Sequence, residues 1–190
     1  MHSLGQVANF KTNSNLPIEK FAVAINSKLK KSIVIKKAEE VDEQFHSRYS
    51  VHSKKYRYII NNSPTGTAIY RELEYQFPFE LNVENMQKAA KYFEGEHDFS
   101  AFKASGTSSK NSVRKIFKAE VLRQDEKIYI ELTGSGFLYN MVRIIAGTLL
   151  DVGIGKIESE EIPAIIESKD RKRAGKTLPA VGLYLVEVTY

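Results

Sequence analysis

The chain has 190 residues, 42% of them hydrophobic, so it can bury a core as one domain or as two small ones. Its formal net charge of +5 favours an anionic partner, and the lack of cysteine excludes disulfides, thiolate metal ligands and cysteine nucleophiles. The four histidines are scattered, no apolar run approaches the roughly 20 residues that span a bilayer, and no signal peptide opens the chain, so we expect a cytoplasmic protein without a metal.

The first half of the chain predicts short strands around a single helix. That helix opens at Leu16-Pro17-Ile18, with Asn15 as its cap, and its apolar residues follow helical spacing as far as Leu29. The predicted extended segments are residues 6–10, the β-branched run 33–38, the strand 53–60 and the less regular stretch 70–79.

The second half predicts longer elements. Its helices span residues 83–93, 137–152 and 159–168, and its strands span residues 113–122, 128–133 and 182–188. Gln124-Asp125-Glu126 joins the first two strands as a hairpin, and the Gly- and Ser-rich residues 105–112 form a loop or a linker. This order indicates the α+β class, with antiparallel or mixed strands and helices on one side, in one unit or in two related units.

The strand 53–60 combines aromatic and basic residues. Alternation along a strand places Tyr56 and Tyr58 on one face and Lys55 and Arg57 on the other. Aromatic rings can stack on unpaired bases while cations neutralise phosphates, so the pattern indicates an RNA contact. The alternative is that the tyrosines pack the sheet and the charges are solvated, because tyrosine is common in strands.

The helix over residues 137–152 carries only one charge before Asp151, and that charge is Arg143. A helix that is apolar almost all round is normally buried, where an unpaired arginine is costly. One interpretation is therefore that Arg143 pairs with a carboxylate and orients it for catalysis. The other is that its side chain reaches the edge of the helix and meets solvent or a surface glutamate.

Asp98 is the best internal candidate for that carboxylate, because aromatic residues follow it in Asp98-Phe99-Ser100-Ala101-Phe102. The favoured interpretation of Asp98 is nevertheless a cap for the short helical turn that comes next. No Ser-His-Asp set, phosphate-binding glycine loop or paired catalytic carboxylates stands out. The residues alone thus predict an RNA contact and no complete reactive centre.

Five segments in order resemble the bacterial tRNA pseudouridine synthase A family along nearly the whole chain. His2-Ser3-Leu4-Gly5-Gln6-Val7 is similar to the family's His-Ala-Leu-Gly-Gln-Val, and Phe45-His46-Ser47-Arg48 with Lys55-Tyr56-Arg57-Tyr58 is similar to its Phe-His-Ala-Arg and Arg-Tyr-Arg-Tyr motifs. The other three segments are Gly95 to Phe102, Gly136 to Arg143 and Gly182 to Leu185. Each segment alone is weak, and the shared order makes the resemblance specific.

The resemblance implies an isomerase that converts uridine to pseudouridine at positions 38–40 of the tRNA anticodon arm, as a homodimer without cofactor or metal. It implies that Tyr56 stacks on the target uracil, that Arg143 pairs with the catalytic aspartate and that Leu183 lines the uracil pocket. The residues that it places near the RNA are His46, Arg48, Lys54, Lys55 and Arg57. The implied fold has two related α+β subdomains, residues 1–81 and 82–190.

The family's nucleophilic aspartate is missing from this sequence. It lies in a Gly-Arg-Thr-Asp-x-Gly-Val-His motif, of which Met1 and His2 occupy the last two places. We therefore expect a chain truncated just after the aspartate, with an incomplete first subdomain, an unpaired sheet edge and no turnover on its own. Arg143 should then take an anion, water or another carboxylate. The alternatives are a non-catalytic tRNA-binding module and a structural domain whose basicity is incidental.

Overall fold

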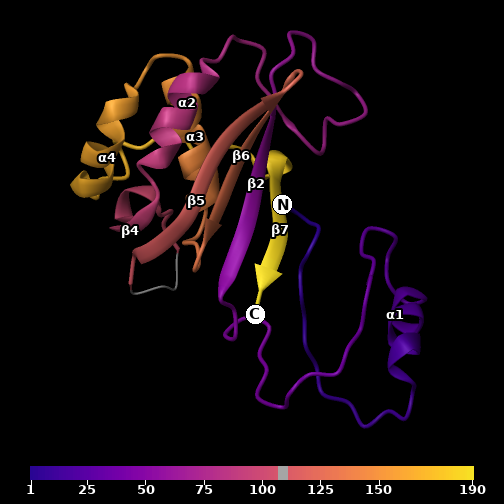
Figure 1. The fold of residues 1–190 in the computed structure, drawn as a ribbon. Coiled ribbons are helices and arrows are strands. Elements are labelled where there is room, and N and C mark those ends of the chain that lie inside the picture. The colour runs from indigo at the N-terminus through magenta and orange to yellow at the C-terminus, as the bar shows by residue number, and fades with distance from the viewer. Residues whose placement is uncertain (107–110) are drawn as a thin grey trace. The chain divides into compact units, whose positions relative to one another are not determined.

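The computed structural model describes residues 1–106 and 111–190. The chain divides into two compact units, residues 1–6 with 51–190 and residues 7–50, and each is described by itself. Part of the loop predicted over 105–112 lies outside the described residues. The larger unit contains a mixed sheet with helices packed against it, so the predicted α+β class is confirmed (Figure 1).

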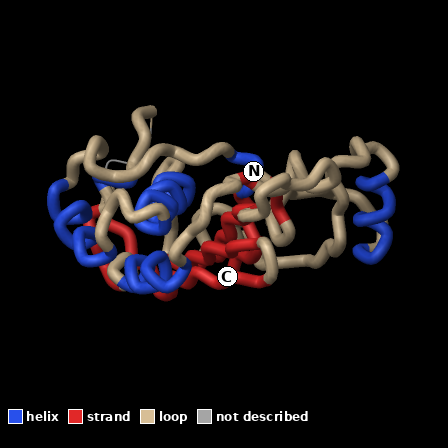
Figure 2. The backbone as a smooth tube through the Cα atoms, turned by 90° about the horizontal axis from the view of Figure 1, so that it is seen from above, coloured by secondary structure: helices blue, strands red, loops and turns tan. Residues whose placement is uncertain are grey.

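Seven strands of the described chain form one sheet in the order β1-β7-β2-β6-β5-β4, with β3 paired to the end of β2. Their bounds are β1 His2–Ser3, β2 Ser53–Asn61, β3 Tyr75–Gln76, β4 Gly95–Asp98, β5 Val113–Gln124, β6 Lys127–Gly134 and β7 Leu183–Thr189. Strand β1 runs parallel to β7 and β3 parallel to β2, whereas the other pairs are antiparallel. Viewed from above, the strands form one twisted layer (Figure 2).

The helices α2 (Val83–Lys91), α3 (Met141–Gly153) and α4 (Ile162–Ser168) lie on one side of this sheet (Figure 1). Helix α2 begins at a side-chain cap, because Oδ1 of Asn82 accepts the N–H of Asn85 at 3.0 Å. Helix α3 is buried on nearly all sides, as its apolar sequence predicts, and supplies the centre of the core. Within the described residues, no helix is long and apolar enough to cross a membrane.

Residues 7–50 depart most from the elements that the sequence predicts. Helix α1 spans Ile18–Asn26 and follows Pro17 without a side-chain cap, so the expected cap by Asn15 is wrong. The strands expected over residues 6–10 and 33–38, all of which are described, do not form. At Ile35 the side chain of Asn26 takes the place of a neighbouring strand: its Nδ2 donates to the backbone oxygen at 2.9 Å and its Oδ1 accepts the N–H at 2.7 Å. Propensity for strand structure has little effect when no second strand offers hydrogen bonds.

Other predicted elements keep their type but change their bounds. The extended stretch 70–79 pairs only over β3, and the helix predicted over 159–168 is a 3₁₀ turn, Ser159–Glu161, followed by α4. Helix α3 begins at Met141, because Asn140 has a left-handed backbone that ends the preceding loop. The β5–β6 hairpin is confirmed, and Asp125 turns it with a φ of 52°. No sequence pattern predicts the short edge strand β4.

Two glycines let the segment that follows α4 lie directly against α3. A Cβ on Gly147 would stand 1.9 Å from the carbonyl oxygen of Lys176, and a Cβ on Gly175 would stand 2.5 Å from the backbone of Gly147 and Thr148. The N–H of Gly175 also donates to Oγ1 of Thr148 at 2.8 Å. This close approach brings Leu178 beside α3, where its backbone takes part in the site described below.

Candidate functional site

Strand β2 lies at the centre of the site, because it pairs with both β6 and β7. Tyr56 stands opposite Leu185 of β7, and Tyr58 stands opposite Leu183. Directly paired residues and alternate residues of a strand share a face, so these four side chains lie on the helix-covered side of the sheet. The register of β2 against β7 shifts between Lys55 and Tyr56, and such irregularities re-aim the side chain beside them.

The two tyrosines of this face have different surroundings. The half-buried ring of Tyr56 meets Phe137 edge to face, with 5.1 Å between the ring centroids. Burial raises the pKa of the Tyr56 hydroxyl, so the group stays protonated at neutral pH. Tyr58 is wholly buried, and its hydroxyl donates to the carbonyl oxygen of Pro179 at 2.7 Å. Tyr58 therefore anchors the segment that leads into β7, whereas none of the described residues forms a hydrogen bond with the Tyr56 hydroxyl.

Arg143 is held by neutral oxygens. Its Nε donates to the carbonyl oxygen of Leu178 at 2.5 Å, and its Nη1 donates to Oδ1 of Asn140 at 2.8 Å. The N–H of Leu178 returns a hydrogen bond to the carbonyl oxygen of Arg143 at 3.2 Å. Among the described residues, no carboxylate lies within ion-pair distance of Arg143. The partners among the described residues are thus a peptide carbonyl and a side-chain amide, and a carboxylate is not one of them.

Leu183 follows a segment that is tied to three elements. Arg143 of α3 binds Leu178, Tyr58 of β2 binds Pro179, and the ring Nε2 of His2 in β1 lies 2.9 Å from the carbonyl oxygen of Val181. Leu183 is only 8% exposed and packs in the core cluster beside Tyr58. The structure therefore brings Tyr56, Arg143 and Leu183 to one region, where β2, β7 and α3 meet.

Lys55 and Arg57 lie on the opposite face of β2, where both are paired with one carboxylate. Lys55 Nζ is 2.5 Å from Oε2 of Glu131, and Arg57 contacts Oε1 through Nη2 at 2.5 Å and through Nε at 2.6 Å. The guanidinium of Arg57 also lies over the ring of Tyr129, 5.3 Å from its centroid. Lys54 lies two residues before Tyr56 and therefore on the same face of β2. None of the carboxylates among the described residues forms an ion pair with Lys54. The charge of Lys55 and Arg57 is thus largely compensated within the protein.

His46 and Arg48 belong to the smaller unit, residues 7–50. The N–H of Arg48 donates to the ring Nδ1 of His46 at 3.1 Å, and both side chains contact the ring of Tyr49. Tyr49 is 75% exposed, so this small cluster presents an aromatic surface with a cation beside it. Such a pairing is suited to contact with a nucleic acid.

Asp98 caps the turn that follows it, as the favoured interpretation predicts. Its Oδ1 accepts the N–H of Ser100 at 3.0 Å and the hydroxyl of Ser100 at 2.6 Å, while Oδ2 lies 2.9 Å from Nζ of Lys169. These hydrogen bonds, from the Ser100 hydroxyl first and from Lys169 next, hold the pKa of Asp98 below its ordinary value. Asp98 is thus a structural carboxylate, and it is not the partner of Arg143.

The residues that sequence reasoning missed are Phe137, Asn140, Leu178 and Glu131. Phe137 and Asn140 flank the start of α3, and the only signal for them was their nearness to Arg143 in the sequence. Leu178 acts through its backbone, which carries no sequence signal at all. Glu131 is buried in β6, where a single acid among apolar residues was a signal that a nearby strand carries cations.

Glu131→Gln is expected to lower the free energy of unfolding by about 1–2 kcal/mol at neutral pH. The substitution removes a buried carboxylate that forms ion pairs with the partly exposed side chains of Lys55 and Arg57. Burial raises the pKa of Glu131, but hydrogen bonds from Lys55 and Arg57 outweigh burial and hold the pKa below its ordinary value. The stabilisation is therefore complete above the ordinary glutamate pKa and is lost as the pH falls through the lowered folded value.

Urea unfolding of wild type and Glu131→Gln from pH 7 downwards measures this difference. The gap between the two proteins should close at acid pH. Glu120→Gln is the matched control on the neighbouring strand, because its partner Lys118 is more exposed than either partner of Glu131. A gap that stays constant with pH would contradict the ion-pair explanation.

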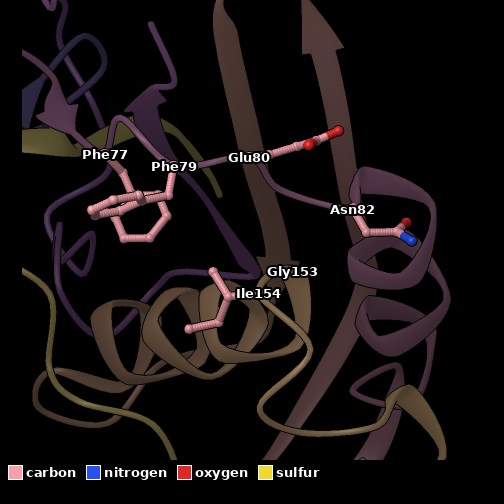
Figure 3. A pocket seen from close by; sticks show the side chains of 6 residues that line it. All are labelled: Phe77, Phe79, Glu80, Asn82, Gly153 and Ile154. Carbon is pink, nitrogen blue, oxygen red and sulfur yellow. The ribbon is translucent and has the colours of Figure 1, made fainter. Parts of the chain in front are cut away.

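A separate hollow of about 830 Å³ opens elsewhere on the larger unit (Figure 3). It is lined by Phe77, Phe79, Glu80, Asn82, Gly153 and Ile154. The rings of Phe77 and Phe79 lie side by side, while the carboxylate of Glu80 points away from them. The hollow shares no residue with the group around Tyr56. Among the described residues, no three acidic or histidine side chains are grouped to hold a metal ion.

Known proteins resemble this chain along its whole length. The family model described as tRNA pseudouridine synthase matches residues 89–190. Proteins named tRNA pseudouridine synthase A are similar over the whole chain: one from Acetivibrio thermocellus and one from Ruminiclostridium cellulolyticum are each 56% identical, and one from Bacillus subtilis is 44% identical. The chain spans 78% of the length of the first two and 77% of the third. The chain therefore belongs to the tRNA pseudouridine synthase family.

Proposed function

We propose that this chain carries part of an active site that converts uridine to pseudouridine at positions 38–40 of the tRNA anticodon stem-loop. The observation that most supports this is the meeting of Tyr56, Arg143 and Leu183 on the helix-covered side of β2 and β7. The three residues combine an aromatic face, an oriented cation and an apolar wall. Such a set can receive a base that has been turned out of its stack.

Each residue has a separate role in this proposal. Tyr56 stacks on the uracil, and its protonated hydroxyl donates a hydrogen bond or relays a proton rather than acting as a phenolate. Leu183 closes the apolar side of the pocket. Arg143 presents its remaining N–H groups to the carboxylate that attacks the nucleotide.

The reaction is an isomerisation, so its atoms balance without a cofactor. The carboxylate forms a bond to the nucleotide, and the bond between N1 of uracil and C1′ of the ribose breaks. The uracil turns, C5 bonds to C1′ as the carboxylate is released, the proton of C5 leaves to solvent and N1 takes up a proton. No other reactant is consumed.

The attacking carboxylate is, in this proposal, an aspartate that is not among the 190 residues of the sequence. The chain alone then binds tRNA without turning it over. The proposal also includes a division into subdomains 1–81 and 82–190, assembly as a homodimer, and a cytoplasmic location. The spans of 77–78% on the related proteins are consistent with a missing segment.

Release of tritium from tRNA that carries 5-tritiated uridine tests the activity. We expect no release by the 190-residue chain, and release by a chimera in which His2 is preceded by whatever segment of the Acetivibrio thermocellus relative lies before the counterpart of His2. Release by the short chain would mean that a carboxylate within it attacks the nucleotide. Tight tRNA binding by an inactive chimera would instead favour a tRNA-binding module.

Lys54 offers the sharpest test of an RNA contact on β2. Its charge is not compensated by a carboxylate of the described residues, whereas Lys55 is paired with Glu131. Lys54→Ala should therefore weaken tRNA binding and lower the slope of log K against log salt by about 0.7–0.9, the value for one phosphate contact. Fluorescence anisotropy at several salt concentrations measures the slope. Lys55→Ala is the control, and an equal loss in both variants would contradict the assignment.

A further inference from the structure

Arg143 donates a hydrogen bond to Asn140, a residue to which the family resemblance gives no role of its own. We propose that Asn140 is a positioning residue, whose side-chain oxygen fixes the guanidinium so that its free donors meet an anion. The inference rests on the proposed function in one respect only, that this anion is the attacking carboxylate. The positioning of Arg143 by Asn140 is inferred from the hydrogen bond between them and does not depend on that function.

The donors of Arg143 divide into two groups. A guanidinium carries five N–H donors in a planar fork. One donor is taken by the carbonyl oxygen of Leu178 and one by Oδ1 of Asn140, and no acceptor of the described residues takes the other three. Because Nε is occupied, an incoming carboxylate cannot use the edge formed by Nε and Nη2. It must bind through the Nη groups, the end that Asn140 holds in place.

Asn140 does not behave as an ordinary helix cap. An asparagine at this position usually has an extended backbone, and its side-chain oxygen accepts an N–H of the first helical turn. Asn140 precedes α3 with a φ of 60° and a ψ of 6°, and its side chain makes no cap hydrogen bond. Its oxygen is directed to Arg143 instead, one helical turn along.

The left-handed backbone of Asn140 strengthens this assignment. Glycine adopts a positive φ with no steric cost, whereas other residues do so with strain, which asparagine tolerates better than most. If only the backbone shape mattered here, glycine would serve at least as well. A side chain at a strained position next to a functional residue is expected to make an interaction that glycine cannot make.

Two substitutions separate the side-chain role from the backbone role. Asn140→Gly keeps the left-handed backbone and removes the oxygen, while Asn140→Asp keeps an oxygen in the same place and also tolerates the backbone. A side-chain role predicts that Asp preserves the orientation of Arg143 and that Gly does not. A purely structural role predicts that Gly preserves it as well as Asp.

Hydrogen exchange of the Nε–H of Arg143, measured by NMR on the ¹⁵N-labelled 190-residue chain, reports this orientation through the hydrogen bond to Leu178, which forms only while the guanidinium stays in place. The signal is assigned by its loss in Arg143→Lys. We expect exchange about five- to tenfold faster in Asn140→Gly, which corresponds to the loss of one hydrogen bond, and exchange within about twofold of wild type in Asn140→Asp. Asn140→Ala is a second way to remove the oxygen, and backbone spectra report whether each variant is folded.

Wild-type exchange in Asn140→Gly would overturn the proposal, and so would fast exchange in Asn140→Asp. The measurement uses no tRNA and no turnover. If the tritium assay fails while the exchange results hold, the proposed function is wrong and the positioning role stands. If the exchange results fail while tritium is released, only the role of Asn140 is lost.

Discussion

Replacing Gly147 with alanine is expected to lower the free energy of unfolding by about 2 kcal/mol. The added Cβ would stand 1.9 Å from the carbonyl oxygen of Lys176, and backbone cannot turn aside as a flexible side chain can. Overpacking of this kind costs about 1–3 kcal/mol and sometimes more, whereas alanine regains only about 0.5–1 kcal/mol in a helix. For a chain of this size the unfolding midpoint should fall by about 4–8 °C.

Thermal and urea unfolding of Gly147→Ala and Gly136→Ala measure the effect. Gly136→Ala is the control, because a Cβ there would meet only side-chain atoms of Arg114 at 3.8 Å. It should stay within about 0.5 kcal/mol of wild type. Because Leu178 lies two residues beyond Lys176, Gly147→Ala should also loosen the hydrogen bond to Arg143. A fully stable Gly147→Ala would contradict the close packing of this segment on α3.

The parts of the fold that the sequence predicts well are those in which local pattern and burial agree. Strand β2 alternates aromatic and basic residues, α2 lies within the helix predicted over residues 83–93, and the turn at Asp125 marks the hairpin. The apolar run of α3 allows little but a buried helix. In each case residues that lie close together in the sequence decide the local structure.

The run 33–38 shows where such reasoning fails. Its β-branched residues favour a strand, but a strand also needs a partner, and the nearby Asn26 supplies both hydrogen bonds of Ile35. The prediction for helix α3 is wrong only at its start, because the left-handed backbone of Asn140 turns the chain before Met141. Residues 137–140 fit the helical pattern, and only the left-handed backbone stops the helix there.

The site is harder to predict than the fold, because its partners are distant in the sequence. Glu131 lies 74 residues from Arg57, and Leu178 lies 35 residues from Arg143. The sequence of β2 alone suggests that its cations contact RNA. Glu131 on the paired strand β6 compensates the charge of two of these cations, Lys55 and Arg57. The distant partner of Arg143 is a peptide oxygen, which any residue type at position 178 would supply.

Replacing Arg143 with lysine in the chimera is expected to lower the rate of tritium release by about 100-fold or more. Lysine keeps the charge, but it places a methylene where Nε now donates to Leu178, and it cannot present a planar fork to a carboxylate. Loss of one oriented donor at a site of developing charge costs roughly 2.7–4 kcal/mol of transition-state stabilisation. The carbonyl oxygen of Leu178 would also lose its side-chain partner.

The matched control is Arg123→Lys, because Arg123 donates one exposed hydrogen bond to Asn62 and lies away from Tyr56. It should keep the rate within about twofold, since a surface change away from the site has little effect. tRNA affinity should change little in Arg143→Lys, because the charge is retained and phosphate contacts dominate the binding. An Arg143→Lys chimera that binds tRNA normally and works at nearly the wild-type rate would mean that Arg143 acts only as a charge. The two hydrogen bonds that orient it would then serve the fold of the segment at Leu178 and not the reaction.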